Sequence, residues 1–481
     1  MVSNRYIMGI DGGSQSTKVT IFDETGRIHA HAGVPLQPLH NPQVGVAEHP
    51  DDDLWASLCN ASRQALDQFE EDPAFIIGVG LCTIRCCRTL LKADGSLANP
   101  VISWMDLRLA EPYQHSDDSV AKVSTSSGYI SHRLTNEFVD TAANLEGQWP
   151  IDKTAWDWSD NDEQVASYGL TRDQLTKLVN PGEELGRISA AASDATGIPL
   201  GLPVIATAND KAVEALGSGL ANRSAVLLSL GTYIGAMKVG DELREPSDAL
   251  FTNMACQPNH YLYESGGIRY GMSTISWFCS LLGSGIEQEA SEQGQTPEQL
   301  LSEEAALINA GSEGLITIPE WLAPPTATYK RGIFMGLQPR HTRAHLFRSL
   351  LEAIALTMKN HVDAMNTELA HDMQELIVSG GGAASDTFMQ ILADVFGTAT
   401  IRRENTDGAG LGAAICVAVA QGIHPNFDQA QQSMVKLGKQ FNPDPANHEI
   451  YQKLNEQCYK NATHATDPTL EALAELSITR A

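Results

Sequence analysis

The chain begins with a short stretch whose polar residues are suited to hold phosphate and a metal ion. Residues 6–23 read Tyr-Ile-Met-Gly-Ile-Asp-Gly-Gly-Ser-Gln-Ser-Thr-Lys-Val-Thr-Ile-Phe-Asp. The apolar runs on both sides of Gly12 and Gly13 predict a β-hairpin with a small polar turn. Backbone N–H groups in such a turn form a nest for an anion, and Lys18 adds a positive charge beside it. Asp11 carries the hard oxygen ligand that Mg²⁺ prefers. An ordinary glycine-containing hairpin without a ligand is the alternative.

A second group of candidates follows a predicted buried strand. Residues 75–81 are apolar (Phe-Ile-Ile-Gly-Val-Gly-Leu), and Arg85 and Cys86 come shortly after them. An arginine in that place is either part of a structural salt bridge or a hydrogen-bonding fork for a polar ligand. A further predicted strand ends in Trp104 and Asp106, which could stack on a sugar and accept its hydroxyls. Taken alone, these two residues are more often a core aromatic and half of a local ion pair.

The carboxylate of Asp210 is the candidate general base. Residues 202–210 predict a strand that ends at this aspartate, and residues 211–217 predict a short helix of small residues. We expect the helix dipole and the free N–H groups of the first turn to keep Asp210 ionised. The residue is then either a simple N-cap or a base presented to a cleft.

Two more glycine-containing turns lie in the second half of the chain. Residues 225–239 repeat the pattern of strand, small turn and strand, with Gly231 and Thr232 in the turn. Residues 376–385 predict a strand that runs into a triple glycine and then a helix. Glycines there let the backbone approach a flat ligand such as an adenine. Residues 407–414 begin a helix of small residues suited to tight packing. The repeated hairpin predicts a duplicated α/β fold that holds a nucleotide between its halves.

The elements that position these residues follow an α/β pattern. The acidic residues 51–53 open a predicted helix, and residues 190–192 lie in a short one. Residues 111–180 are polar and irregular, and we place no chemistry there.

Composition narrows the class of protein. A length of 481 residues predicts two or more domains, and a net charge of -27 argues against nucleic acid or an anionic membrane as partner. The first five residues lack the apolar core of a signal peptide, and no run of 18 apolar residues occurs, so we expect a soluble, cytoplasmic protein. The eight cysteines show no metal-ligand spacing and are expected to be reduced and mostly buried.

The motifs, taken in order, resemble those of the FGGY carbohydrate kinases. They are Asp-Gly-Gly-Ser-Gln-Ser-Thr-Lys, Trp-Met-Asp-Leu-Arg, Asn-Asp-Lys before a helix, Leu-Gly-Thr, Gly-Gly-Gly-Ala-Ala-Ser and Leu-Gly-Ala-Ala. The resemblance spans nearly the whole chain. It implies an α/β fold of two ribonuclease-H-like (actin-like ATPase) domains around a central cleft. We expect residues 1–220 on the sugar and phosphate side and residues 221–481 on the nucleotide side. The implied activity is phosphorylation of a sugar or polyol hydroxyl, with ATP and Mg²⁺ as cofactors.

The resemblance also implies roles for the candidate residues. Asp210 corresponds to the general base, and Asp11 helps to hold the metal. The substrate-binding residues are Arg85, Cys86, Trp104, Asp106 and Asp210. The nucleotide-binding residues are Ser14, Gln15, Lys18, Gly231, Thr232, Gly381 and Ser385.

Departures from the glycerol kinase-like members bear on the substrate. The segment between Arg108 and Ser124 is much shorter than in those members. Cys86 stands where glycerol kinases carry an acid, Lys211 replaces a polar neighbour of the base, and Asp407 stands where many members have glutamate. A small ketose or polyol is therefore expected rather than glycerol.

Three other classes of function stay open beside a ketose or polyol kinase. One is a glycerol kinase. Another is a nucleotide-switched, actin- or Hsp70-like ATPase, which would share both hairpins but would not need a base at Asp210. The third is an inactive sugar-binding regulator, which would keep Arg85 and lose the metal or phosphate residues. The presence of Asp11, Asp210, Gly231 and Gly381 favours an active enzyme. Its expected partners are ATP and a small sugar or polyol, with no nucleic acid and no membrane, and a homodimer stays open.

Overall fold

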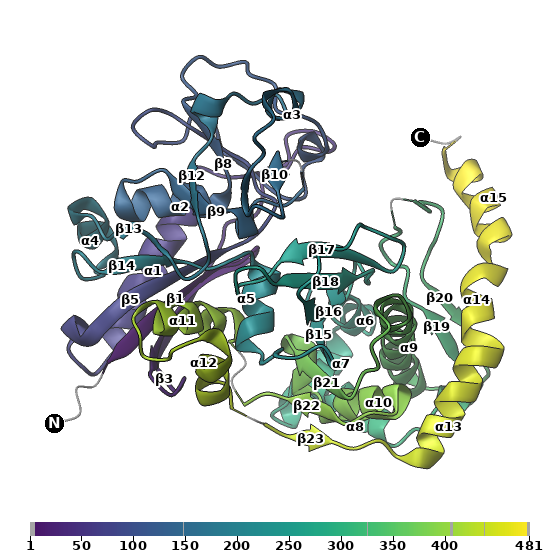
Figure 1. The fold of residues 1–481 in the computed structure, drawn as a ribbon. Helices are drawn as coiled ribbons and strands as arrows, with labels where there is room; N and C mark the ends of the chain where they lie inside the picture. The colour runs from purple at the N-terminus through teal and green to yellow at the C-terminus, as the bar shows by residue number, and fades with distance from the viewer. Residues whose placement is uncertain (1–4, 148, 325, 405–406, 437, 479–481) are drawn as a thin grey trace.

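The structure is a computed structural model that describes residues 5–147, 149–324, 326–404, 407–436 and 438–478. Each half of the chain builds one large sheet. We call the elements on the first sheet the N-terminal lobe and those on the second sheet the C-terminal lobe; Figure 1 shows them side by side, with a run of C-terminal helices along the outer edge. The division of the chain at residue 220 stays a prediction.

The first sheet has six strands, in the order β13-β14-β5-β1-β2-β3. The predicted first hairpin is confirmed, because β1 and β2 pair antiparallel with Asp11 opposite Lys18. Strand β5 runs parallel to β1 and places Cys82 beside Asp11. The bounds are β13 (Glu184–Arg187), β14 (Pro203–Ala206), β5 (Ile76–Thr83), β1 (Tyr6–Gly12), β2 (Ser16–Asp23) and β3 (Ile28–Pro35).

The second sheet has seven strands and repeats this plan. Its order is β17-β18-β16-β15-β21-β22-β23, and it again starts from an antiparallel hairpin, β15 with β16, whose first strand pairs parallel with β21. The predicted duplication is therefore present in the sheets. The bounds are β17 (Leu250–Met254), β18 (Tyr261–Ser265), β16 (Ile234–Gly240), β15 (Ala225–Leu230), β21 (Glu375–Ser379), β22 (Thr400–Arg402) and β23 (Gln440–Phe441).

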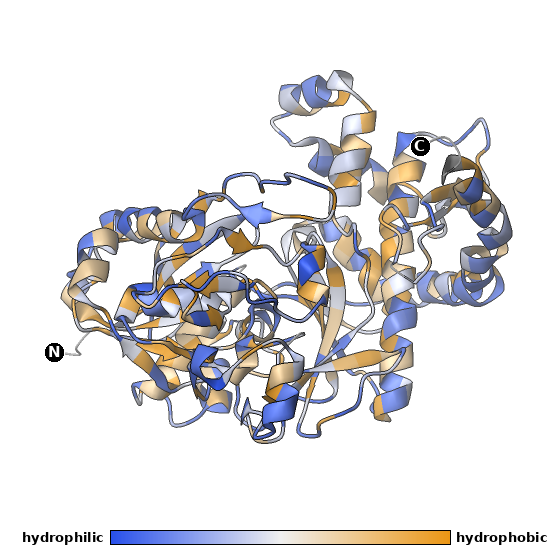
Figure 2. Cartoon of the chain, turned by 90° about the horizontal axis from the view of Figure 1, so that it is seen from above, coloured by the Kyte–Doolittle hydropathy of each residue, from blue (hydrophilic) through white to orange (hydrophobic). Residues whose placement is uncertain are grey.

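Helices cover both faces of each sheet, so the strands carry apolar residues almost continuously. Helix α1 (Asp53–Gln68) packs on the outer face of the first sheet, where Met8 and Ile10 are buried. Helices α5 (Asp210–Gly217) and α11 (Gly408–Ala420) lie between the sheets, in one core that contains Ile7 of the first sheet and Leu227 of the second. Figure 2 shows the apolar residues gathered in strands and on helix faces, and the polar residues in loops.

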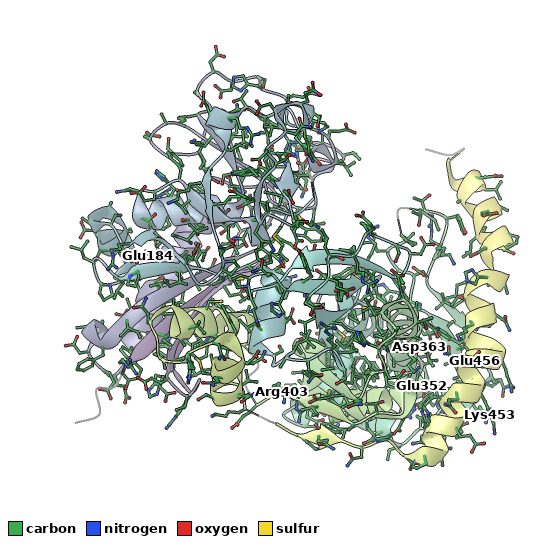
Figure 3. The ribbon with its side chains drawn as sticks, viewed as in Figure 1. Glu184, Glu352, Asp363, Arg403, Lys453 and Glu456 are labelled. Atoms are coloured by element: carbon green, nitrogen blue, oxygen red, sulfur yellow. The ribbon has the colours of Figure 1, made fainter. Side chains whose placement is uncertain are left out.

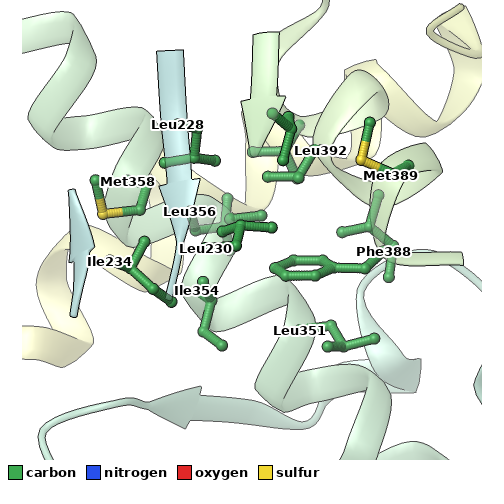
Figure 4. Close-up of a cluster of buried hydrophobic side chains, with 14 of the residues drawn as sticks. Leu228, Leu230, Ile234, Leu351, Ile354, Leu356, Met358, Phe388, Met389 and Leu392 are labelled. Carbon is green, nitrogen blue, oxygen red and sulfur yellow. The ribbon is translucent and has the colours of Figure 1, made fainter. Parts of the chain in front are cut away.

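The largest core lies on the outer face of the second sheet. Leu228 and Leu230 of β15 pack there against α9 (Arg343–Leu369) and α10 (Asp386–Phe396). Figure 4 shows Phe388 of α10 pointing toward this cluster, beside Leu351 and Ile354 of α9. Helix α9 is 27 residues long and buries residues from Ala344 to Leu369 within the C-terminal lobe.

Glycines let α11 approach the first sheet and α5 at backbone distance. A Cβ on Gly80 of β5 would lie 2.3 Å from the carbonyl oxygen of Ala413, and one on Gly412 would lie 2.0 Å from that of Val213. Because those neighbours are backbone atoms, only glycine fits at either place. The predicted small-residue helix is confirmed, and its packing joins a late segment of the chain to the N-terminal lobe.

A polar contact also crosses between the lobes. Arg403 donates to the carbonyl oxygen of Ser218, just after α5, at 3.0 Å, and its guanidinium lies 3.6 Å from Glu375 of β21. Figure 3 labels this arginine where the two lobes meet.

The prediction of an irregular segment at 111–180 was wrong. It contains α2 (Ser126–Thr135), α3 (Asp162–Ser167) and several short strands around a small core with Trp149 and Leu170. Helix α2 escaped prediction because its sequence, Ser-Ser-Gly-Tyr-Ile-Ser-His-Arg-Leu-Thr, has little apolar periodicity, although nine of its residues are buried.

The remaining elements surround these layers. The other strands are β4 (Glu48–His49), β6 (Thr89–Leu91), β7 (Val101–Ile102), β8 (Lys122–Ser124), β9 (Val139–Thr141), β10 (Ile151–Asp152), β11 (Asp157–Trp158), β12 (Lys177–Val179), β19 (Ile316–Ile318) and β20 (Ile333–Met335). The other α-helices are α4 (Ala190–Thr196), α6 (Ser273–Leu281), α7 (Ser284–Glu292), α8 (Pro297–Ala306), α12 (Phe427–Met434), α13 (Pro445–Leu454), α14 (Lys460–Ala465) and α15 (Asp467–Ile478). Within the described ranges, no helix is both long and apolar enough to cross a membrane.

Candidate active site

The turns of the two repeated hairpins touch each other. Gln15, in the turn between β1 and β2, donates a hydrogen bond of 3.3 Å from Nε2 to Oγ1 of Thr232, in the turn between β15 and β16. Ser14, Gln15 and Thr232 are exposed, and Gly231 is half-buried. The structure therefore brings the predicted phosphate-binding turns of both halves to one place, with their small polar groups accessible.

Asp11 lies beneath these turns, at the end of β1. The residue is 7% exposed, and its carboxylate lies 3.5 Å from the Nζ atom of Lys18. Burial raises the pKa of Asp11 to about 7; Lys18 opposes this shift, while Asp407 and Asp210 add to it. A cation that approaches a buried carboxylate near other acids stabilises its charged form and lowers its pKa.

The surroundings of Asp11 do not form a closed metal cage. In the part of the chain that the structure describes, no three histidine, cysteine, aspartate or glutamate side chains are grouped to hold a metal ion. This donor set fits Mg²⁺, which is usually bound by one or two carboxylates together with phosphate oxygens and water.

Arg85 stands two residues beyond the end of β5 and is held by acidic side chains from both lobes. Its Nη1 and Nη2 atoms donate to the two carboxylate oxygens of Glu264 on β18, at 2.6 and 2.9 Å. Nη1 also donates to Glu146 at 3.2 Å, and Nε lies 3.7 Å from Oδ1 of Asp210. The predicted substrate arginine and the predicted base are therefore neighbours, and Arg85 also carries a salt bridge.

Cys86 beside Arg85 has a left-handed backbone, with φ of 61°. This backbone conformation is uncommon for residues other than glycine. Strained positions of this kind cluster at functional sites. Burial, followed by the negative charge of Glu146, raises the pKa of the Cys86 thiol to about 12. The thiol therefore stays neutral and is a weak hydrogen-bond partner.

Asp210 lies at the start of the predicted helix, but β14 ends at Ala206 rather than at Asp210, and Asp210 is the first residue of α5, not its N-cap. That place belongs to Asn209, whose side chain accepts hydrogen bonds from the backbone N–H groups of Lys211 and Ala212. Oδ1 of Asp210 also accepts from the N–H of Lys211, at 2.9 Å, which leaves Oδ2 without a hydrogen bond to the described residues. Burial raises its pKa, with Arg85 and Lys211 opposing the shift.

A buried polar network lies next to Asp210, around Lys211 and Glu214. Lys211 donates from Nζ to Glu214 and to Ser229 of β15, both at 2.9 Å, and Glu214 also accepts from Ser379 of β21 at 2.6 Å. The network ties α5 to two strands of the C-terminal lobe. Burial disfavours the charged form of Lys211, but Glu214 and Asp210 outweigh it and raise the pKa of Lys211, so the ammonium group stays charged beside Asp210.

Trp104 and Asp106 are placed differently from each other. Trp104 is 47% exposed, so its ring is available for stacking. Asp106 is 4% exposed and caps a 3₁₀ helix at Leu107–Ala110. Its carboxylate accepts from the backbone N–H of Ala47 and from the guanidinium of Arg108. Among the described residues, no hydrogen bond or ion pair joins Asp106 to Arg85, so its substrate role stays a prediction.

The triple glycine after β21 opens a 3₁₀ helix at Gly381–Ala384. A Cβ on Gly381 would meet no atom within 4 Å, so the backbone faces open space there. Ser385 caps α10, since its hydroxyl accepts from the N–H of Phe388 at 3.2 Å, and it also donates to Ser302. Contacts of Gly381 and Ser385 with a nucleotide stay predictions.

Sequence reasoning missed two residues of the site, Glu146 and Glu264. Glu146 lies just after a 3₁₀ helix at Ala142–Asn144, in the segment where no chemistry was placed. Glu264 is 4% exposed within β18. A charged residue in an otherwise buried strand is the one signal that could have found Glu264, because a buried carboxylate needs a partner.

Comparison with known proteins agrees with this fold. The models for the N-terminal and C-terminal domains of the FGGY family of carbohydrate kinases match residues 6–117 and 109–217, and residues 226–421. The chain therefore belongs to the FGGY family and is a carbohydrate kinase.

The relatives include proteins of several named activities. A protein of Escherichia coli (strain K12), described as an uncharacterized sugar kinase, YgcE, is 44% identical over 475 residues, which cover 99% of this chain and 96% of the relative. A xylulose kinase of Lactococcus lactis is 23% identical over 97% of this chain and 99% of its own. The solved xylulose kinase from Rhodospirillum rubrum shares 26% identity with a TM-score of 0.80, covering 97% of this chain and 100% of its own.

Proposed function

We propose that this carbohydrate kinase transfers the γ-phosphoryl group of ATP to a hydroxyl of a small ketose or polyol, with Asp210 as general base. The observation that carries the proposal is the position of Asp210. Asp210 is the first residue of α5, and its carboxylate lies 3.7 Å from the guanidinium of Arg85. The N-cap of the helix is Asn209.

Each group has a chemical task in this proposal. ATP with Mg²⁺ supplies the phosphoryl group and neutralises the charge that develops on it. Asp11 and Lys18 would hold the metal and phosphate side, together with the turns at Ser14 and Thr232. Arg85 would donate to substrate oxygens, and Asp210 would accept the proton of the attacking hydroxyl at a carboxylate oxygen.

The substrate class rests on three observations. Arg85 offers a planar donor to hydroxyl or carbonyl oxygens, Cys86 cannot accept as a carboxylate does, and the exposed ring of Trp104 suits stacking. Relatives named as xylulose kinases act on a ketose and support the same class for this chain. A coupled ADP-release screen over pentuloses, hexuloses, polyols and glycerol tests it. If glycerol gave the highest kcat/KM, the proposal of a larger ketose or polyol as substrate would be wrong.

The base is tested by Asp210→Asn. A carboxylate that accepts the proton during transfer is worth typically about 10²–10⁴ in rate. We expect kcat to fall by roughly that factor, with the affinities for ATP and sugar changed only a few-fold. The matched control is Asp162→Asn. Asp162 is likewise the first residue of a helix, α3, and follows an asparagine N-cap. Wild-type turnover in Asp210→Asn would refute the base.

The same assay separates the ATPase alternative. A nucleotide-switched ATPase would release ADP at the same rate with and without sugar, and Asp210→Asn would leave that rate unchanged. A kinase requires the sugar for ADP release beyond a slow background.

A further inference from the structure

The guanidinium of Arg85 is outnumbered by carboxylates. Glu264, Glu146 and Asp210 approach it from β18, from the segment after residues 142–144 and from α5, at 2.6, 3.2 and 3.7 Å. Lys153 is the other cation that acts on Glu146, and its Nζ atom is bound to the carbonyl oxygen of Thr252. Lys211 also acts on Asp210 but is paired with Glu214 at 2.9 Å. Four carboxylates thus face three cations, and with all of them ionised the candidate substrate site has an excess of negative charge.

Glu146 is held rigidly next to the candidate base. Its Oε1 atom accepts a hydrogen bond of 2.6 Å from the side-chain amide of Asn209, the residue directly before Asp210. That amide also donates to the carbonyl oxygen of Ala143, just upstream of Glu146, at 3.2 Å. The N-cap residue of α5 therefore fixes the position of Glu146 relative to Asp210.

Glu146 keeps more acceptor capacity than Glu264, whose Oε1 atom already accepts two bonds. Both oxygens of Glu264 face Arg85, and one of them also accepts from the amide of Asn253. Each oxygen of Glu146 accepts one bond, from Asn209 or from Arg85, whereas a carboxylate oxygen accepts about two. The residue is 9% exposed, and burial together with the charges of Glu264 and Asp210 raises its pKa.

We propose that Glu146 is a specificity-determining residue, which accepts a hydrogen bond from a second substrate hydroxyl and repels substrates that carry a carboxylate. The inference rests on the proposed function and narrows its substrate class to uncharged polyhydroxy compounds. A hydroxyl chain that passes over Arg85 reaches Asp210 on one side and Glu146 on the other, because both carboxylates lie against the same guanidinium. Sugar acids would bring a further negative charge to a place that already has an excess.

The test compares a neutral substrate with the sugar acid of the same carbon skeleton. At pH 8, above the pKa of about 7 to which burial raises Glu146, we expect kcat/KM of the wild type to favour the neutral compound by roughly 100-fold or more, since like charges in contact are strongly disfavoured. Glu146→Gln should raise KM for the neutral substrate roughly 10- to 100-fold through loss of a charged hydrogen bond, with kcat within a few-fold. It should also reduce the preference against the acid about tenfold. The matched control is Glu184→Gln, on β13 at the outer edge of the first sheet (Figure 3), where Glu184 pairs with Arg187.

A rescue variant separates recognition from a folding defect. Cys86 lies within the same cluster and has φ of 61°, a conformation that aspartate tolerates better than most residues. Adding Cys86→Asp to Glu146→Gln should restore part of the affinity and part of the discrimination, whereas a misfolded variant would not recover. Unchanged KM and unchanged discrimination in Glu146→Gln would overturn the inference.

Direct binding keeps this test independent of turnover. Calorimetric titration of the full chain with the neutral compound and with its acid measures discrimination even if no sugar is phosphorylated. Absence of turnover with intact discrimination would count against the proposed kinase substrate alone. Equal binding of both compounds, or tighter binding of the acid, would overturn the role of Glu146.

Discussion

Asp11, the proposed metal ligand, also bears on the stability of the whole chain. Its pKa is raised from the usual 3.8 to about 7, chiefly by burial. A carboxyl with a raised pKa favours the folded state fully below its unfolded pKa, and this contribution is lost as the pH rises through the folded value. Above neutral pH, Asp11 therefore bears a buried charge that Lys18 offsets only in part and that a bound cation would stabilise further.

We accordingly expect Asp11→Asn to melt a few degrees above the wild type at pH 8 in the absence of nucleotide. The difference should shrink as the pH is lowered from 7 to 4, because the wild-type carboxyl takes up its proton in the folded state. Saturating Mg²⁺ and ATP should reverse the order, since only the wild type gains the metal contact. Thermal melts over this pH range, with and without Mg²⁺ and ATP, are the measurement.

Asp106 is the control of opposite sign. Hydrogen bonds and the charge of Arg108 outweigh burial and lower its pKa. Asp106→Asn should therefore be less stable than the wild type at pH 8, and the gap should close toward low pH. A melting temperature of Asp11→Asn below that of the wild type at pH 8 would contradict the account of the buried charge.

At the scale of elements, the contact of α11 with α5 sets the spacing of the layers. The backbone of α11 approaches α5 so closely that a Cβ on Gly412 would lie 2.0 Å from the carbonyl oxygen of Val213. Gly412→Ala should destabilise the fold by about 1–3 kcal/mol or more, because backbone must move to admit the methyl group. Urea denaturation measures the loss.

Gly285→Ala in α7 provides the comparison. Its Cβ would meet no atom within 4 Å, and glycine within a helix costs roughly 0.5–1 kcal/mol relative to alanine. This variant should be neutral or slightly more stable. Equal effects of the two substitutions would show that close packing is not the reason for Gly412.

Elements with a local signature could be predicted from the sequence. Both hairpins, the strand before Arg85 and the helix that begins at Asp210 follow from apolar runs bounded by glycine and by capping residues. Contacts between segments that are distant in the sequence could not be predicted from such local patterns. The small-residue helix at 408–420 was expected, but not its place against the first sheet. Glu146 lies in the loop after the 3₁₀ helix at Ala142–Asn144, and nothing local signals that it meets Arg85.

At the scale of the whole molecule, the candidate site lies between the two lobes. Gln15 meets Thr232, and Arg85 meets Glu264, so groups from both sheets face one another. A nucleotide and a sugar bound at these groups would draw the lobes together and exclude water. We expect the radius of gyration to be smaller with both ligands than with neither.

Small-angle scattering on Asp210→Asn is the suitable experiment, since slow turnover keeps both ligands bound. Either ligand alone should give an intermediate or unchanged value. A radius that stays constant with both ligands at saturation would contradict closure between the lobes.

The place of α11 has a consequence for biosynthesis. The strands that it covers are complete by residue 206, where β14 ends, and its partner α5 ends at residue 217, whereas α11 itself spans Gly408–Ala420. At about 5–20 residues per second, a ribosome needs on the order of ten to forty seconds to pass from α5 to α11. Throughout that interval the inner face of the first sheet, with Ile7 and Cys82, has no cover from this helix. The nascent chain therefore presents an apolar surface to chaperones until its second half has been made.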